Sequence, residues 1–399
     1  MIQRIAIEQF KSLKHVDLKL GSLNLLIGTN GSGKSNLLDV LRVLRGIAAG
    51  YPLKELFEGN GRTASGDAGL GIRGGLDLAQ SRGQNSEEDQ RLKPDIGLRV
   101  DLENRLGLLR YEIEFDSTGA VNSENLWQAG REVFKYADRE GYFLQAGSNT
   151  LSAIYPNAYL GSQIILAFRS GLVDIHHQEL VQAWRTQLLR TQLLEPDPRV
   201  LRQYGSTTKE PRMGDHGENF ASLVRDICSD PARKEGYLGW LKELRPLEIE
   251  DVMTRNGALG EPLFFVREGT RELPSAVLSD GTLRFAALAA AFFQTDMPEV
   301  LTIDEIENGI HPGRLRLLLQ LLRQRAGQTQ TQVFAATHSP LLLDWLTEEE
   351  WQTTFFFHRD PSTGFSSITP LVDLPGFRSA AKQGRIGQLF AEGWMDFAL

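Results

Sequence analysis

The sequence has very little cysteine and no long apolar run. Cys228 is the only cysteine among 399 residues, so an intramolecular disulfide is excluded, and so is a cysteine-rich metal site. No stretch approaches the ~20 apolar residues that a membrane-spanning helix needs. The N-terminus, MIQRIAIEQF, alternates like a strand and lacks the core of a signal peptide. We therefore expect a soluble, cytoplasmic protein with no membrane partner.

Basic residues are outnumbered by acidic ones: 43 Lys and Arg against 51 Asp and Glu give a formal net charge of −8 at pH 7. This balance argues against a protein coated in basic surface for nucleic acid, but it leaves room for a local basic groove. Two arginine clusters are candidates for such a groove, and solvated helix faces would explain both about as well. The clusters are Arg185, Arg190 and Arg199, and Arg314, Arg316, Arg323 and Arg325.

The pattern along the chain predicts three parts. Alternating residues at 96–103 and 109–116 predict a hairpin, as do EVFKY and YFLQ further on, while the glycine-rich residues 59–95 predict loops. From about residue 150 the pattern becomes helical, and QELVQAWRTQLLRTQLL is its clearest segment. IEDVMTR and PLFFVRE then predict strands. We expect a β-rich N-terminal part over residues 1–150, a helical insertion over 151–245 and a C-terminal part over 246–399.

Residues 28 to 35 read GTNGSGKS and fit the phosphate-loop pattern GxxxxGK[ST]. The apolar run LNLLI before them predicts a buried strand, and the stretch after them predicts a helix that ends at Gly50. This order places a bound phosphate at a helix N-terminus, where the Ser35 hydroxyl can ligate Mg2+. The residues predicted to bind the nucleotide are Gly28, Asn30, Gly31, Ser32, Gly33, Lys34, Ser35 and Asn36.

An acid pair follows a second apolar strand. In EVLTIDEIENGIHP, the strand VLTI leads directly into Asp304 and Glu305. Beside a phosphate loop, Asp304 could hold Mg2+ through water, and Glu305 could orient and deprotonate the water that attacks a phosphate. Two adjacent acids after an apolar strand also occur at solvated strand ends. The interpretation as a catalytic pair therefore depends on the presence of GTNGSGKS in the same chain.

Two more segments fit a phosphate site. LSDGTLRFAALAAAFF predicts a helix of small apolar residues that begins near Ser279 and Gly281, and a helix start favours an anion. A capped core helix explains this segment equally well. QVFAATHSP predicts a strand that delivers His338 at its end, where an imidazole could hydrogen-bond a γ-phosphate.

In this order, GTNGSGKSNLL, LSDGT, TIDEIENGIHP and ATHSP resemble the ABC-type ATPase heads of the RecF and SMC class. They are most similar to the stand-alone AAA-type ATPases related to the overcoming-lysogenisation (OLD) group. The similarity extends to FKSLKHVDL and more weakly to GENFASLV, so it covers roughly half of the chain. The resemblance implies an α/β fold: a P-loop ABC-type ATPase head with a β-rich N-terminal lobe and an inserted helical region.

The resemblance also implies ATP and Mg2+ as ligands and a homodimer or higher homo-oligomer. LSDGT would be the signature motif, so that Ser279 and Gly281 of one subunit cap the ATP bound to Lys34 of the other. Asp304 and Glu305 would form the Walker B pair, with Glu305, Lys34 and His338 as the catalytic groups. His338 would be the switch histidine, and Asn308 to His311 would meet their counterpart at the dimer interface.

The sequence departs from the family pattern at several positions. Asp280 replaces the usual middle glycine of the signature, and we expect its carboxylate to point away from the phosphates. The glutamine that completes Mg2+ coordination stays open among Gln80, Gln84, Gln90 and Gln163. About 60 residues follow THSP, which we interpret as too few for the nuclease domain of OLD-type enzymes. A single cysteine also excludes a zinc hook.

By resemblance, we expect ATP-driven dimerisation that regulates a DNA transaction, in repair or in defence against foreign DNA. The alternative is a nucleotide-dependent scaffold that recruits and restrains a separate effector, such as a toxin or nuclease. A P-loop kinase would leave LSDGT and THSP unexplained. An ABC transporter subunit is disfavoured, because the long middle insertion is unlike a compact transporter head.

Overall fold

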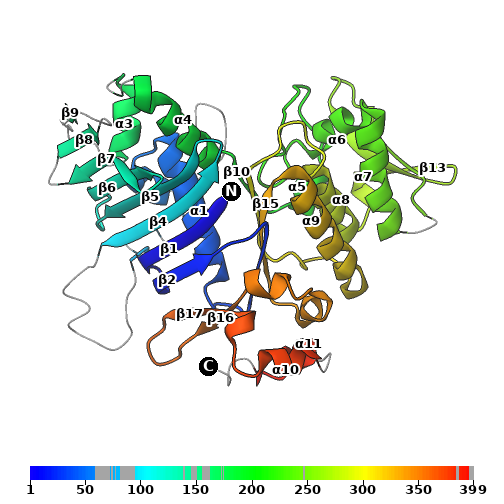
Figure 1. The fold of residues 1–399 in the computed structure, drawn as a ribbon. Coiled ribbons are helices and arrows are strands. Elements are labelled where there is room, and N and C mark those ends of the chain that lie inside the picture. Colours follow the sequence, from blue (N-terminus) through cyan, green and yellow to red (C-terminus); the bar gives the residue numbers. More distant parts are fainter. Residues whose placement is uncertain are drawn as a thin grey trace. The chain divides into compact units, whose positions relative to one another are not determined.

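The computed structural model describes residues 1–58, 72, 75–76, 78–80, 95–137, 140–144, 151–154, 162–171, 173, 175–245, 248–382 and 386–394. Most of the loop predicted at 59–95 lies outside them. The chain forms two compact units, whose elements are labelled in Figure 1. Unit 1 comprises Met1–Thr191 and Gln352–Asp373, and unit 2 comprises Gln192–Trp351 and Leu374–Leu399. This division into two units does not test the three parts expected from the sequence, which remain a prediction.

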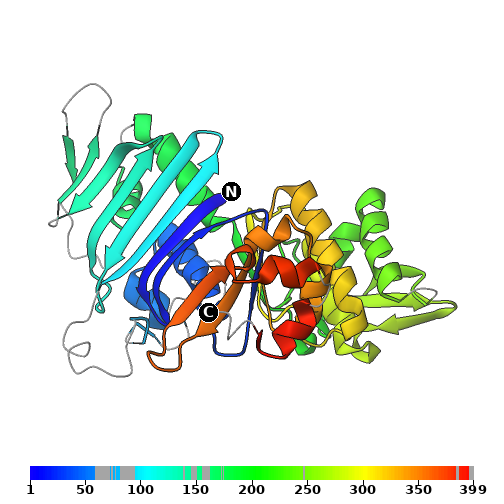
Figure 2. The ribbon, with the colours of Figure 1, turned by 60° about the horizontal axis from the view of Figure 1, so that its bottom comes forward.

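An eight-stranded sheet is the largest element of unit 1 (Figures 1 and 2). Its order is β2-β1-β4-β5-β6-β7-β8-β9, and every neighbouring pair is antiparallel. The strands are β1 (Ile2–Phe10), β2 (Leu13–Lys19), β4 (Ile96–Asn104), β5 (Gly107–Phe115), β6 (Val121–Gln128), β7 (Arg131–Ala137), β8 (Glu140–Leu144) and β9 (Leu151–Ile154). Both predicted hairpins are confirmed, as β4–β5 and β7–β8. The helical pattern predicted from residue 150 is wrong over β9, whose backbone pairs with β8.

Helices bury one face of this sheet through aromatic contacts. Trp184 of α4 (Ile175–Leu189) lies 4.6 Å from Tyr111 of β5, measured between ring centroids. Phe57 of α2 (Leu53–Glu58) contacts Phe10 and Phe115 at centroid distances of 6.4 and 6.1 Å. Aromatic pairs at these separations add to the free energy gained from burial. Helix α3 (Gln163–Arg169) contacts both α4 and β6.

The predicted helix QELVQAWRTQLLRTQLL is too long by one segment. Helix α4 ends at Leu189, and TQLL forms the strand β10 (Thr191–Leu194). All four residues of β10 are buried. The helical pattern is wrong there because burial in a strand overrides local periodicity, which is a weak constraint over so few residues.

The strand before the phosphate loop pairs with a segment from far along the chain. β3 (Leu23–Gly28) runs parallel to β16 (Thr354–Arg359), which is antiparallel to β17 (Ser366–Pro370). All six residues of β3 are buried, as its apolar run predicts. The helix α1 (Lys34–Ala49) follows the loop and ends at Gly50, where φ is 80°. The predicted order of strand, loop and helix is therefore confirmed.

Unit 2 combines a buried pair of parallel strands with helices and a small meander. β14 (Val300–Ile303) is parallel to β15 (Gln332–Thr337), and every residue of both strands is buried. β11 (Asp251–Asn256), β12 (Pro262–Glu268) and β13 (Arg271–Pro274) form the antiparallel meander. The helices are α5 (Pro198–Leu201), α6 (Phe220–Cys228), α7 (Pro231–Leu244), α8 (Asp280–Ala291), α9 (Leu315–Thr329), α10 (Phe377–Lys382) and α11 (Ile386–Ala391). The strands predicted from IEDVMTR and PLFFVRE are confirmed as β11 and β12.

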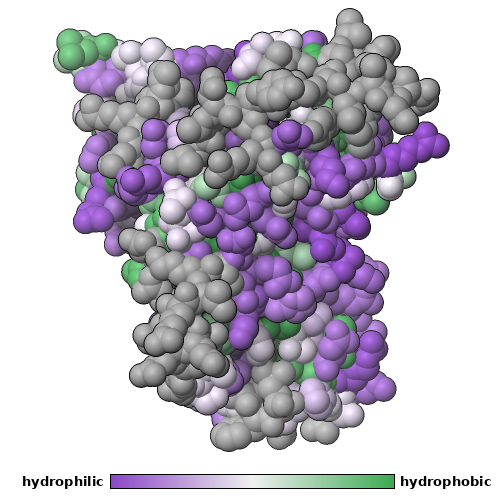
Figure 3. All heavy atoms as spheres, turned by 90° about the vertical axis from the view of Figure 1, so that its left-hand side faces the viewer, coloured by the Kyte–Doolittle hydropathy of each residue, from purple (hydrophilic) through white to green (hydrophobic). Residues whose placement is uncertain are grey.

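The described surface is largely hydrophilic on the face shown in Figure 3, where apolar side chains show only in small areas. None of the helices in the described part of the chain is both long and apolar enough to cross a bilayer.

Candidate functional site

The phosphate loop of unit 1, residues 28–35, closes around the buried side chain of Lys34. Its Nζ donates to the carbonyl oxygens of Gly28 and Thr29, both at 2.8 Å. Gly31 and Gly33 have φ angles of 77° and 107°, in the left-handed region that favours glycine. A Cβ on Gly28 would lie 2.3 Å from a backbone oxygen of β16, so this position has no room for a side chain. The glycines of GTNGSGKS therefore have a local steric reason.

Two serines that are far apart in the sequence support this loop. The Ser366 hydroxyl of β17 donates to the carbonyl oxygen of Ser32 at 2.6 Å and lies 2.7 Å from the hydroxyl of Ser12. The side-chain amide of Asn36 donates to the Ser12 hydroxyl at 2.8 Å. Asn36, predicted to bind nucleotide, therefore has its amide engaged by the support of the loop. The sequence could not reveal the serine pair, because 354 positions separate its members.

The start of α1 suits an anionic ligand. Its N-cap residue, Gly33, provides no capping side chain, and no acidic residue lies in the first turn. The N–H groups and dipole of a helix start favour a negative charge. Asn30 and Gly31 are exposed, and no described atom lies within 4 Å of a Cβ built on Gly31. Ser35 is in the first turn of α1, and its hydroxyl oxygen is a ligand type that Mg2+ accepts.

In unit 2 the acid pair, Asp304 and Glu305, follows β14 as predicted. Asp304 is half-buried, Glu305 is exposed, and the N–H of Glu305 donates to Asp304 Oδ1 at 3.1 Å. Glu305 has a φ of 48°, a left-handed conformation that costs about 1–3 kcal/mol for a residue with a side chain. Surrounding contacts must hold such a conformation. One is the N–H of Asn308, which donates to the carbonyl oxygen of Glu305 at 2.9 Å.

Glu307 connects the loop after the acid pair to His338. Its Oε1 accepts a hydrogen bond from the backbone N–H of His338 at 2.7 Å and lies 2.8 Å from Nδ1 of the same residue. The His338 side chain is 46% exposed at the end of β15, so its ring is oriented by Glu307 and still reachable. The sequence predicted His338 but not Glu307, because TIDEIENG contains three acids and spacing does not tell which one contacts the histidine.

The signature helix α8 begins within LSDGT. Ser279 is its exposed N-cap residue, and Oγ accepts a hydrogen bond from the N–H of Thr282 at 3.2 Å. The Asp280 carboxylate pairs with Nη2 of Arg202 at 2.6 Å, and the same guanidinium donates to the carbonyl oxygen of Leu278 at 2.9 Å. Arg202 therefore offsets the negative charge that Asp280 brings to this helix start.

Gly281 allows α8 to contact the loop that follows the acid pair. A Cβ on Gly281 would lie only 2.2 Å from the carbonyl oxygen of Gly309. Gly309 itself has a φ of 71° and belongs to the segment Asn308 to His311. Gly281, the glycine of LSDGT, therefore has a structural role inside unit 2, independent of any ligand.

Gly281→Ala is expected to lower the free energy of unfolding by about 1–3 kcal/mol, because overpacking against a backbone oxygen forces the helix start to shift. Gly327→Ala is the matched control in α9, where no described atom lies within 4 Å of the added Cβ. That control should stabilise the helix by about 0.5–1 kcal/mol. Thermal unfolding of both variants should shift the midpoint in opposite directions, and equal shifts would show that the Gly281 contact is unimportant.

The arginine clusters considered for a basic groove are largely engaged inside their own units. Five of the seven guanidinium groups contact an acceptor in the same unit. The contacts are Arg185 with Ala48 O (3.0 Å), Arg199 with Asp197 (2.7 Å), Arg314 with Glu243 O (3.4 Å), Arg323 with Glu350 (2.6 Å) and Arg325 with Phe292 O. These contacts reduce the case for a groove built from these arginines.

Two of the four candidate glutamines are described, and both are buried in unit 1. Gln84 and Gln90 lie outside the described residues. Gln80 forms an isolated antiparallel β-bridge with Phe10. The N–H of Gln163 at the start of α3 donates to the carboxylate of Glu124 at 2.6 Å. Glu124 is fully buried, and its burial raises the pKa of its carboxyl group. These contacts do not decide which glutamine completes Mg2+ coordination.

Two segments of the chain match known ATPase-domain families: one contains GTNGSGKS, and the other contains LSDGT, TIDEIENGIHP and ATHSP. Residues 229–344 match the family described as "AAA domain, putative AbiEii toxin, Type IV TA system", and residues 1–55 match the family described as "AAA ATPase domain". A curated relative, the "ATP/GTP phosphatase" of Helicobacter pylori, is 23% identical over 371 residues. The alignment covers 87% of this chain and 88% of the relative.

Solved SMC heads share the fold. The SMC head bound to the C-winged helix domain of ScpA has a TM-score of 0.55 at 14% identity, over 92% of this chain and 96% of that one. The Smc head with an extended coiled coil, bound to the C-terminal domain of ScpA derived from Pyrococcus furiosus, has a TM-score of 0.54 at 11% identity, over 96% and 99%. The chain therefore has the predicted P-loop α/β fold of an SMC head. Segments at both ends of the chain match ATPase-domain families, and together with the fold these matches support an ABC/SMC-like ATPase head that hydrolyses ATP.

Proposed function

We propose that this ATPase head dimerises around ATP and that its dimerisation regulates a DNA transaction, in repair or in defence against foreign DNA. The observation that carries the proposal is the exposed start of α8 at Ser279. It is a second helix start suited to phosphate, in addition to the start of α1 in the phosphate loop. Arg202 offsets the negative charge of Asp280, so this helix start does not repel an anionic phosphate. In the proposed dimer, that phosphate belongs to the nucleotide of the other subunit.

In the proposed reaction, Lys34 and the first N–H groups of α1 bind the phosphates of ATP. Glu305 aligns a water molecule and takes its proton as the water oxygen attacks the γ-phosphorus; the bond to the bridging oxygen of ADP breaks. Ser35 and Asp304 would hold Mg2+, which supplies positive charge that neutralises the phosphates. His338, oriented by Glu307, donates a hydrogen bond to the γ-phosphate. These roles are based on the motifs and on the local geometry within each unit.

The proposed dimer is head to tail, as a homodimer or within a larger homo-oligomer. Ser279 and Gly281 of each subunit cap the ATP that Lys34 of the other subunit holds. ATP then contributes contacts to both surfaces only while its γ-phosphate is present, so hydrolysis favours separation. The mechanical output of the head is therefore closing with ATP and opening after hydrolysis.

The DNA role is supported by the resemblance to RecF-, SMC- and OLD-like heads. The net charge of −8 and the internally engaged arginines favour a second candidate, in which the ATP-bound dimer is a scaffold that restrains a separate effector such as a toxin or nuclease. The family matched at residues 229–344 is itself described as a putative toxin of a type IV toxin–antitoxin system, so this match points to toxin systems without favouring restraint of a separate toxin.

The ATPase rate with and without double-stranded DNA tests the DNA role. We expect DNA to raise the rate, and we expect the stimulation to weaken between about 50 and 200 mM salt, because phosphate contacts release counterions. The Lys34→Ala variant measures any contaminating ATPase in the same preparation. If DNA leaves the ATPase rate unchanged at both salt concentrations and the protein does not bind DNA, the DNA role is contradicted and the scaffold is favoured.

A further inference from the structure

Arg284 is a buried cation directly behind the acid pair, and no recognised motif assigns it a role. It is five residues after Ser279 on α8 and only 9% exposed. Its Nη2 donates to the carbonyl oxygens of Asp304 and Glu305, at 3.3 and 3.2 Å. Burial lowers the pKa of the guanidinium group, but an arginine stays protonated at neutral pH. Nearby carboxylates act in the opposite direction to burial and favour the charged guanidinium; they include Glu305, Glu195 and Glu307.

We propose that Arg284 is the positioning residue that holds Glu305 in its left-handed conformation and couples it to the signature helix. The proposal rests on the role of Glu305 in hydrolysis given above. Without the guanidinium, the carbonyl oxygens of Asp304 and Glu305 lose a charged donor, and the positive φ of Glu305 loses part of its support. Relaxation to a negative φ would turn the Cα–Cβ bond of Glu305, and its carboxylate would no longer align the water.

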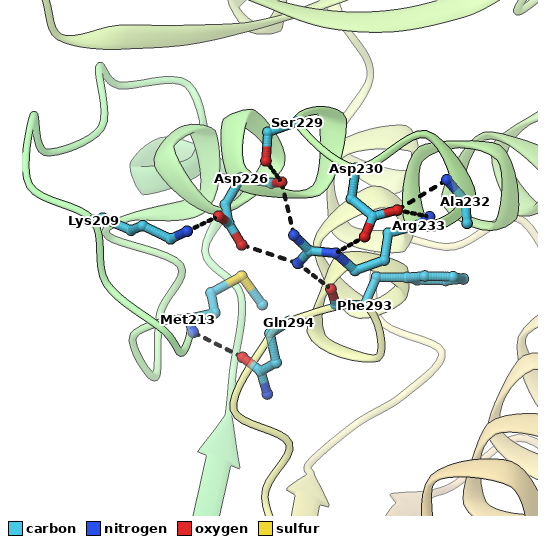
Figure 4. Close-up of polar contacts among 9 residues, drawn as sticks. All are labelled: Lys209, Met213, Asp226, Ser229, Asp230, Ala232, Arg233, Phe293 and Gln294. Atoms are coloured by element: carbon cyan, nitrogen blue, oxygen red, sulfur yellow. Dashed lines mark hydrogen bonds and ion pairs between the residues drawn. The ribbon is translucent and has the colours of Figure 1, made fainter.

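The contacts of α8 make it a rigid connection to the acid pair. At its start, Gly281 contacts the loop of Gly309. Beyond its end, the carbonyl oxygen of Phe293 accepts a hydrogen bond from Arg233 of α7 at 3.3 Å (Figure 4). The same guanidinium donates to the carboxylate of Asp226 in α6 at 2.9 Å, as Figure 4 also shows.

A second arginine fixes the same end of α8. Arg325 of α9 donates to the carbonyl oxygen of Phe292 and lies over the ring of Phe293 at 4.3 Å. Because Ser279 and Arg284 belong to the same continuous helix, a displacement of α8 at Ser279 carries Arg284 with it. The helix that caps the nucleotide of the partner would therefore set the geometry of Glu305 in its own subunit.

The first test separates catalysis from ATP binding. Arg284→Met should lower kcat about tenfold or more and change the ATP dissociation constant by less than about threefold, since it removes hydrogen bonds to the backbone of Asp304 and Glu305 and none of the side chains proposed to bind ATP. Arg284→Lys should recover part of the rate, because an ammonium can donate to one of the two carbonyl oxygens. Arg323→Met is the matched control: it removes another partly buried arginine of unit 2 that donates to a backbone carbonyl oxygen, that of Trp345 at 3.1 Å, in a segment other than α8. It should leave kcat within about threefold.

The second test is a double-mutant cycle with Glu305→Gln, measured by single-turnover phosphate release. If Arg284 acts through Glu305, adding Arg284→Met to Glu305→Gln should lower the rate no further. An additional loss as large as in the wild-type background, or an equal loss of kcat in Arg323→Met, would overturn the positioning role. If Arg284→Met does not fold, Arg284→Lys enters the same cycle. If Glu305→Gln alone leaves the rate unchanged, the role of Glu305 in the proposed function fails, and this inference fails with it.

Discussion

Replacing Glu305 with glutamine is expected to lower kcat for ATP hydrolysis by about 100-fold or more, the contribution typical of a general base. Glutamine keeps the size of the side chain, and the backbone contacts of Asn308 and Arg284 to residue 305 are unaffected. It cannot accept a proton from water, so chemistry slows while ATP binding persists. Steady-state phosphate release should show the loss, and a fluorescent nucleotide should bind within about threefold of the wild-type affinity.

Glu349→Gln is the matched control for this change. Glu349 is an exposed carboxylate of unit 2 that follows β15 and lies outside the acid pair. Its replacement should leave kcat within about twofold, as surface substitutions usually do. An unchanged kcat in Glu305→Gln would mean that another group activates the water.

Lys34→Ala is expected to weaken ATP binding by about 100-fold, which corresponds to about 2.7 kcal/mol of lost charge-assisted contact. The ammonium of Lys34 is already within the phosphate loop, where it contacts Gly28 and Thr29. Its removal deletes both the cation for the phosphates and the contacts that keep the loop closed. Titration with a fluorescent ATP analogue should show the loss. Thermal unfolding should no longer shift upward with ATP, because a ligand stabilises only the protein that binds it.

Lys54→Ala controls for the loss of a lysine from the same unit. Lys54 is exposed on α2, and its ammonium lies 3.8 Å from Glu58, so it contributes little to stability. ATP affinity should be unchanged in this variant. Tight ATP binding by Lys34→Ala would contradict the assignment of GTNGSGKS as the nucleotide site.

The sequence predicted the parts of the site that depend on local order. The strand before GTNGSGKS, the helix after it and the strands before Asp304 and His338 all form as expected, because burial pattern and glycine placement act over a few residues. The same locality explains the error at Thr191–Leu194, where four residues carry too little periodicity to distinguish a strand from the end of a helix.

The contacts that orient the site were not predictable from spacing. Ser366 supports a loop that lies more than 300 positions earlier, and Glu307 is one of three acids in its segment. Arg284 is part of a helix whose other residues are mostly apolar, and nothing in that pattern reveals the carbonyl oxygens of Asp304 and Glu305 as its partners. These contacts depend on packing within a unit, which a single sequence does not determine.

The mass of Glu305→Gln in solution tests the ATP-driven dimer most directly. Light scattering would be recorded without nucleotide, with Mg2+ and ADP, and with Mg2+ and ATP. The mass is expected to double with Mg2+ and ATP but not in the other two conditions. Adding Ser279→Arg is expected to abolish the doubling, because the larger side chain blocks the start of α8. A Glu305→Gln protein that binds ATP and keeps the mass of a monomer would contradict the account.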